Sequence, residues 1–149
     1  MYKIVLLIII PFFAFGQGFT VINPSFEGPV GPGITPAPWF TCMAGQTPDT
    51  QPGNWGVTLP ASDGATYLGF VHDTPGNWQE GAGQQLVELS DPTIPAPLSA
   101  GTNYQFTIDI AGYQLTSGVT FSSNAELLIY GGFGICPQEE LLWSSGDTP

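Results

Sequence analysis

The chain has 149 residues, of which 42% are hydrophobic, so it is long and apolar enough to bury a core. It carries twelve aspartates and glutamates against one basic residue, Lys3. Nucleic acids, anionic lipids and phosphorylated ligands are therefore poor candidates as partners, because their affinity comes largely from Lys and Arg. Carboxylates without neighbouring cations attract divalent metals, above all Ca²⁺ outside cells, although a high net charge also serves solubility alone.

The first sixteen residues, MYKIVLLIIIPFFAFG, have the features of a secretory signal peptide. Lys3 gives a positive start, the stretch 5–15 is almost wholly apolar, and Ala14 and Gly16 supply the small residues of a cleavage site. We therefore predict a secreted mature chain, 17–149, that forms one domain. It has no predicted membrane span, since no later segment reaches the roughly eighteen unbroken apolar residues that a bilayer requires.

The rest of the chain predicts an all-β fold, because short runs rich in Val, Ile, Phe, Tyr and Thr alternate with Gly, Pro, Asn and Asp clusters. The expected strands, in chain order, are 19–27 with a break at Pro24, 65–71, 84–89, 103–113 and 125–133, followed by a short segment at 139–143. The clearest is 103–113, in which the apolar residues Tyr104, Phe106, Ile108 and Ile110 alternate with polar ones. This alternation predicts a strand with one buried face.

The stretch 28–60 contains seven prolines and no convincing strand, so we expect a long loop that is either functional or disordered. Trp39, Phe40 and Trp55 lie within it and favour a packed loop. We expect Trp39, Trp55 and Trp143 to contribute to packing more than to ligand binding.

The segment 71–86, VHDTPGNWQEGAGQQL, holds the only histidine of the chain. His72 and Asp73 are adjacent, and adjacent side chains of an extended segment point to opposite faces, so they cannot form a hydrolase triad. One histidine and two distant cysteines do not make a zinc site, and no framework supports Asp73 and Glu80 as paired glycosidase carboxylates. We therefore predict that the protein is not an enzyme.

The same segment is interpreted as a strand end, a turn-rich loop and the start of the next strand. An exposed tryptophan can stack on the apolar face of a sugar ring, so Trp78, with His72, Asp73 and Glu80 around it, is the candidate ligand-binding rim. The alternative is that Trp78 folds back onto the core.

Cys42 and Cys136 are the only cysteines. In an oxidising compartment two cysteines usually pair, so we predict a disulfide that holds the proline-rich loop against the strand end near Cys136. The alternative is two separate buried thiols.

VINPSFEG (21–28), GAGQQL (81–86), PLSAGTNYQFTIDIAG (97–112) and AELLIYGG (125–132) resemble the galactose-binding-like, carbohydrate-binding-module-like jelly rolls of secreted bacterial proteins. WFTCMAGQTPDTQP with GICPQEELLWSS is similar to a subgroup from surface and gliding-motility-associated proteins of the Bacteroidetes type. The resemblance covers nearly all of 20–146.

The resemblance implies a jelly-roll β-sandwich whose function is extracellular, non-catalytic recognition, with a glycan or polysaccharide as ligand. The alternative is a structural or adhesive module without a glycan ligand. It also implies a structural Ca²⁺ near the first strand, where Glu27 matches the early carboxylate. Such domains continue with two or three further strands, so we expect an incomplete sandwich with exposed apolar surface, and a larger polypeptide that continues beyond Pro149 and can attach to the cell surface.

Overall fold

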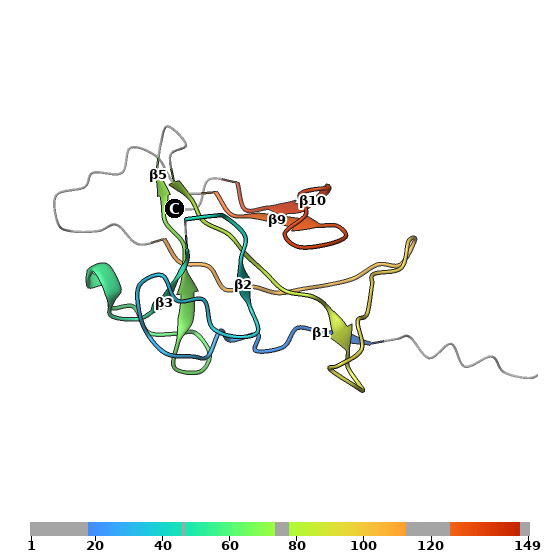
Figure 1. Cartoon of the computed structure of the whole chain (residues 1–149), viewed down its shortest axis with the longest axis horizontal. Helices are drawn as coiled ribbons and strands as arrows, with labels where there is room; N and C mark the ends of the chain where they lie inside the picture. The colour runs from blue at the N-terminus through green and yellow to red at the C-terminus, as the bar shows by residue number, and fades with distance from the viewer. Residues whose placement is uncertain (1–17, 46, 74–77, 113–125, 147–149) are drawn as a thin grey trace, which may run out of the picture.

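The computed structural model describes residues 18–45, 47–73, 78–112 and 126–146 (Figure 1). The predicted leader, 1–16, lies outside these residues. The fold is all-β, as the sequence predicts, with short strands and one turn of 3₁₀-helix. In chain order the elements are β1 (Phe19–Thr20), β2 (Phe40–Thr41), β3 (Asp49–Gln51), η1 (Asn54–Gly56), β4 (Tyr67–Gly69), β5 (His72–Asp73), β6 (Trp78–Gln79), β7 (Ala82–Gly83), β8 (Val87–Glu88), β9 (Leu128–Gly131) and β10 (Glu140–Ser144). No helix of the described residues is long and apolar enough to cross a membrane.

The described strands pair in five antiparallel two-stranded sheets: β1–β8, β2–β7, β3–β4, β5–β6 and β9–β10. The first three pairs are nested, because the chain runs outward through 19–51 and returns antiparallel to itself through 67–88. The hairpin β5–β6 lies within the returning half. A long antiparallel ribbon of this kind brings residues of distant sequence together along its whole length.

Most of the predicted strands contain an observed one. β4 lies within 65–71, β8 lies within 84–89 and β9 lies within 125–133, and β10 overlaps the predicted segment 139–143. The first predicted strand is much shorter than expected. It ends at Thr20, and Asn23 and Phe26 have left-handed φ angles of 53° and 59°, which turn the chain on both sides of Pro24.

The prediction that 28–60 contains no strand is wrong, because β2 and β3 lie in it. β3 has the sequence Asp-Thr-Gln, which carries no apolar signal. It is nevertheless fully buried, since β4 pairs along one edge and Gly31 bridges to Thr50 on the other. Polar residues form a strand here because neighbouring backbone satisfies them.

The prediction of a buried strand at 103–113 is also wrong for its described residues, 103–112. They run as an extended trace that pairs with no described strand (Figure 1). Their apolar side chains are exposed, at 39% for Tyr104, 51% for Phe106, 42% for Ile108 and 43% for Ile110. Alternation favours an extended backbone, but a sheet forms only where a second strand lies alongside.

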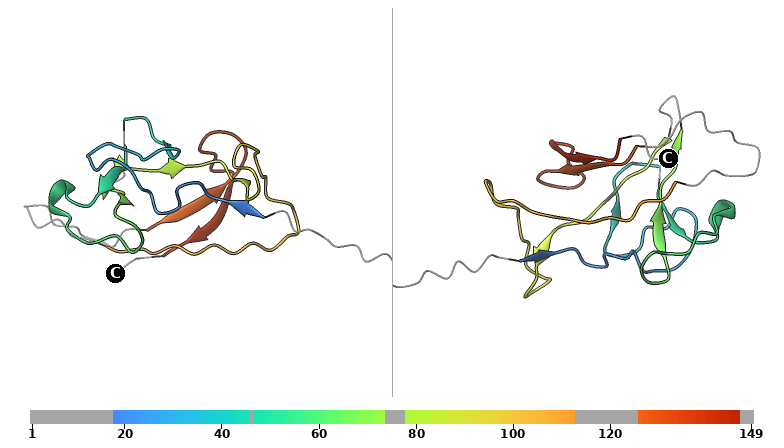
Figure 2. Two further views of the ribbon diagram at one scale, coloured as in Figure 1. Left: turned by 90° about the horizontal axis from the view of Figure 1, so that it is seen from below. Right: turned by 180° about the vertical axis from the view of Figure 1, so that it is seen from behind.

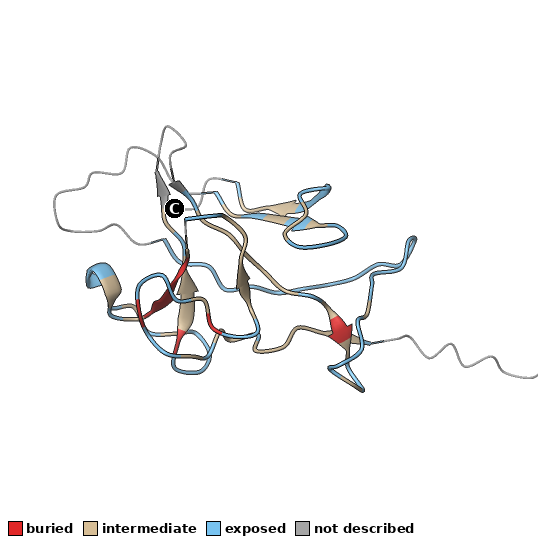
Figure 3. Ribbon diagram, viewed as in Figure 1, coloured by how far each residue is buried: buried red, intermediate tan, exposed pale blue. Residues whose placement is uncertain are grey.

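The buried interior of the described residues is small and mainly polar (Figure 3). Val87 is its buried hydrophobic residue, whereas Asp49, Thr50, Gln51 and Thr66 are buried polar residues. Thr50 is fully enclosed; its hydroxyl donates to the Ile34 carbonyl at 2.6 Å and its amide donates to the Gly31 carbonyl at 3.1 Å. Hydrogen bonds of this kind offset the cost of removing the polar groups from water.

The predicted disulfide is confirmed: Cys42 and Cys136 are bonded, with their Cα atoms 5.3 Å apart. Cys42 follows β2, and Cys136 lies in the connection between β9 and β10. The bond therefore joins the β9–β10 hairpin to the nested ribbon across a sequence separation of 94 residues.

Candidate functional site

The residues of the candidate rim belong to one hairpin, β5–β6. His72 pairs with Gln79, and Asp73 pairs with Trp78, which brings the backbones of all three candidate residues together. Trp78 therefore lies in strand β6 and not in the turn-rich loop that precedes it. The side chains of His72, Asp73 and Trp78 lie outside what the structure describes.

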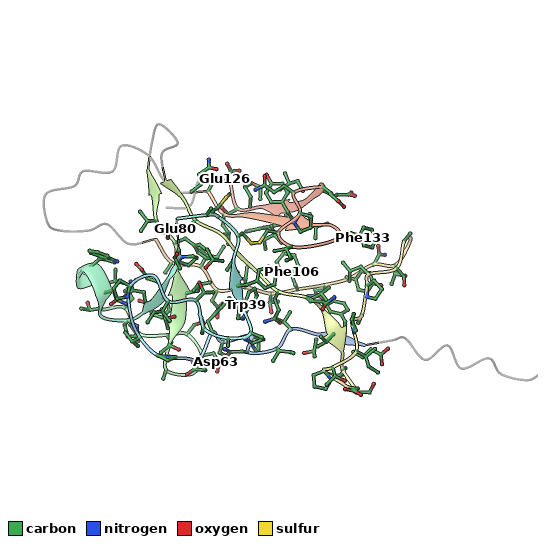
Figure 4. The ribbon with its side chains drawn as sticks, viewed as in Figure 1. Trp39, Asp63, Glu80, Phe106, Glu126 and Phe133 are labelled. Atoms are coloured by element: carbon green, nitrogen blue, oxygen red, sulfur yellow. A yellow bond between two sulfur atoms is a disulfide. The ribbon has the colours of Figure 1, made fainter. Side chains whose placement is uncertain are left out.

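Glu80, the fourth candidate, closes the base of this hairpin (Figure 4). Its Oε2 accepts the amide N–H of Val71 at 2.7 Å, which ties the residue after β6 to the residue before β5. The pKa of Glu80 is raised, chiefly because burial disfavours the charged carboxylate, and the nearby charge of Asp49 acts in the same direction. The Val71 hydrogen bond opposes this shift without reversing it. Glu80 is thus a half-buried structural acceptor.

Glu27, the candidate calcium ligand, is also committed to the backbone. Its Oε1 accepts the amide N–H groups of Ala65 at 2.9 Å and Thr66 at 3.1 Å, and it lies close against Gly64. The side-chain oxygen of Asn23 accepts the main-chain N–H of Glu27 at 2.7 Å and so fixes the backbone at Glu27. Among the described residues no group of three or more His, Cys, Asp or Glu residues could hold a metal ion. Glu27 therefore serves to fix the loop that precedes β4.

Sequence reasoning missed Trp55, which it assigned to packing. The structure contradicts that assignment, because Trp55 is 61% exposed. Its φ of 56° lies in the left-handed region, which is strained for a bulky residue and is found mostly where the surrounding structure enforces it. The sequence feature that could have indicated an exposed Trp55 is the run Gly53-Asn54-Trp55-Gly56. Its two glycines have positive φ and form a tight turn on either side of Trp55.

The conformation of Trp55 is enforced by the polar residues of β3. The indole Nε1–H of Trp55 donates to Oδ2 of Asp49 at 2.5 Å, and the other oxygen, Oδ1, accepts the amide of Gly33 at 2.6 Å. Asn54 is held in turn: its side chain donates to the Thr50 carbonyl at 2.7 Å and its amide donates to the Gln51 side chain at 2.9 Å. Asp49 is 6% exposed, so an almost inaccessible carboxylate orients a largely exposed ring.

Asp49 pairs with Gly69 of β4, the strand that precedes the β5–β6 hairpin. Its charge also contributes to the raised pKa of Glu80 at the base of that hairpin. An oriented aromatic face beside polar backbone and carboxylate groups can bind a neutral, hydroxyl-rich ligand, since the apolar face of such a ligand stacks on the ring.

The other two tryptophans that the structure describes in full have different roles. Trp39 packs as predicted: its Nε1–H donates to the Asn23 carbonyl at 2.8 Å and its ring lies 4.6 Å from that of Phe26. Trp143, on β10, lines an open groove of about 440 Å³ together with residues 106–109 of the extended segment. Its ring meets that of Phe106 edge-on, with centroids 6.2 Å apart.

No protein-family model, curated protein or solved structure matches the chain, so a functional assignment depends on the residues described above.

Proposed function

We propose that the chain is a non-catalytic, extracellular recognition domain of the jelly-roll type that binds a neutral glycan. The observation that carries the proposal is Trp55: a ring that is 61% exposed, held in a strained backbone conformation by a buried carboxylate. Backbone strain that presents an apolar ring to water costs stability without a structural return, and strain of this kind clusters at ligand-binding sites.

The charge of the chain supports a neutral ligand. Twelve carboxylates and no lysine or arginine after Lys3 leave no permanently cationic side chain for a phosphate or a carboxylated sugar. The hydroxyl groups of a neutral sugar need only hydrogen-bond acceptors and donors, and its C–H face needs an aromatic platform. The β5–β6 hairpin, with His72, Asp73 and Trp78, is proposed as the second side of the same surface because β4, which pairs with Asp49, leads directly into it.

The test is the binding of soluble neutral polysaccharides, such as xylan, mixed-linkage β-glucan and galactomannan, measured by affinity electrophoresis. Trp55→Ala should weaken retention about tenfold, since an aromatic contact contributes about 1.5 kcal/mol at most. Trp55→Phe, which keeps a ring but loses the bond to Asp49, should bind with intermediate strength.

Phe133→Ala is the matched control, because Phe133 is 85% exposed but lies in the β9–β10 connection (Figure 4). Trp78→Ala tests the hairpin in the same assay. Equal retention of the wild type, Trp55→Ala and Trp78→Ala proteins on every polysaccharide would reject the proposal, whereas a loss of unfolding free energy without a loss of binding would assign the rings to packing.

The second candidate is a structural or adhesive module of a larger surface protein, without a glycan ligand. It is favoured by the β9–β10 connection, where Phe133 and Ile135 are 85% and 84% exposed beside the disulfide. This module would retain no polysaccharide in the assay above. A structural Ca²⁺ at Glu27 is a separate proposal: the melting temperature of the wild type, but not of Glu27→Gln, should rise on addition of Ca²⁺.

A further inference from the structure

The extended segment 103–110 has an unpaired backbone. None of its main-chain N–H or C=O groups is hydrogen-bonded to another residue that the structure describes. Its position is nevertheless defined: the Tyr104 hydroxyl accepts the Ser99 amide at 2.8 Å, and the Tyr104 ring packs edge-on against Phe19 of β1 with centroids 5.2 Å apart. The segment thus has the conformation of a strand without a neighbour.

A groove lies beside this segment and is formed in part by it. Four successive residues, 106–109, line the groove opposite Trp143. In an extended chain, successive side chains point to opposite faces, so a surface formed by four in a row includes both faces and the main chain between them. Figures 1 and 2 show the segment running past the β9–β10 hairpin, which carries Trp143.

The side chains on the two faces indicate what would fit there. Phe106 and Ile108 are 51% and 42% exposed, so an incoming strand could cover them with apolar residues at alternate positions. On the other face, Asp109 lines the groove, and no lysine or arginine follows Lys3 in the chain. A second copy of the chain would bring the same excess of negative charge and would be repelled.

From this edge, its exposed apolar row and its charge, we infer that residues 103–110 accept a β-strand from a cationic partner, a segment in which apolar residues alternate with Lys or Arg. Main-chain hydrogen bonds along the edge provide affinity, and Asp109, together with the net negative charge of the chain, selects the basic side chains. This inference is independent of the glycan-binding proposal, because Trp55 takes no part in it.

The probe is a peptide of about eight residues that alternates valine with lysine, the length of an ordinary strand. Hydrogen exchange of the full chain, followed by mass spectrometry, should show the amides of 103–110 exchanging about tenfold more slowly when the peptide is bound, because amides that become paired are protected. A peptide with glutamate in place of lysine should give no protection.

Two N-methylated forms of the lysine peptide separate strand pairing from general attraction of charge. Each carries methyl groups on alternate amides, so that one form blocks one hydrogen-bonding edge and the other form blocks the opposite edge. A strand binds through one edge only, so one form should protect 103–110 and the other should not. Asp109→Asn should weaken the lysine peptide about two- to fivefold, the scale of an exposed ion pair, whereas Asp91→Asn, a loop carboxylate outside the groove, should not change its affinity.

Equal protection by both methylated forms would overturn the inference, because it would show binding without strand pairing. Protection that rises with protein concentration in the absence of peptide would overturn it in favour of a second copy of the chain. Protection by the glutamate peptide would overturn the choice of a cationic partner.

Discussion

Removal of the disulfide by the double substitution Cys42→Ser/Cys136→Ser should destabilise the protein severely. The bond spans 94 residues, and a loop of that length restricts the unfolded chain by about 4.7 kcal/mol in the chain-entropy model at 25 °C. An ordinary domain has a free energy of unfolding of about 5–15 kcal/mol, so this loss is a large part of the total. It is large here because few apolar residues are buried to offset it: among the described residues, the buried apolar side chains are those of Val87 and of the prolines Pro36 and Pro48.

Urea unfolding of the wild type and of the double serine variant, followed by tryptophan fluorescence, measures this loss. The wild type treated with reductant serves as a second form without the bond and should unfold at the same urea concentration as the variant. Amide exchange in β9 and β10 should accelerate more than exchange in β3 and β4, because the bond joins the β9–β10 hairpin to the rest of the chain.

A loss below about 1 kcal/mol in both forms would refute this reasoning. It would mean either that the unfolded chain is already restricted without the bond, or that the packing of Trp143 against Phe106 suffices to hold the hairpin.

Two further predictions concern the carboxylates. The folded pKa of Glu80 is raised above its unfolded value, so its contribution to stability is fully present below the ordinary Glu pKa and is lost as the pH rises through the raised one. Glu80→Gln, which can still accept the Val71 amide, should remove the fall in unfolding free energy that begins as the pH rises above the ordinary Glu pKa. An unchanged pH profile in Glu80→Gln would contradict this. Gly64→Ala should destabilise by more than the about 1–2 kcal/mol of a left-handed alanine, since a Cβ at Gly64 would clash with Oε1 of Glu27 and displace it from the amides of Ala65 and Thr66. Gly101→Ala, with a similar φ of +74° and no atom within 4 Å, is the control, and equal losses for both variants would show that Glu27 does not hold its loop tightly.

The candidate binding surface could be predicted from the sequence only in part. The sequence drew attention to the segment 71–86, and the structure brings its candidate residues together in one hairpin. The assignment of Trp55 to packing failed, because the exposure of a side chain depends on what surrounds it in space. Trp55 is oriented by Asp49, which precedes it by six residues, but Asp49 itself is held by the Gly33 amide and by pairing with β4.

By itself, the sequence determined the all-β class and the disulfide. β-branched and aromatic runs between turn residues exclude long helices, and two cysteines have one way to pair within a chain. Only the tertiary structure decided that the polar segment Asp49–Gln51 forms the buried strand β3 and that the apolar segment 103–110 pairs with no described strand. Strand pairing depends on residues that are distant in the sequence. The alternation at 103–110 therefore specified an extended backbone but not a pairing partner, whereas Asp49–Gln51 pairs with β4 and Thr50 bridges to Gly31.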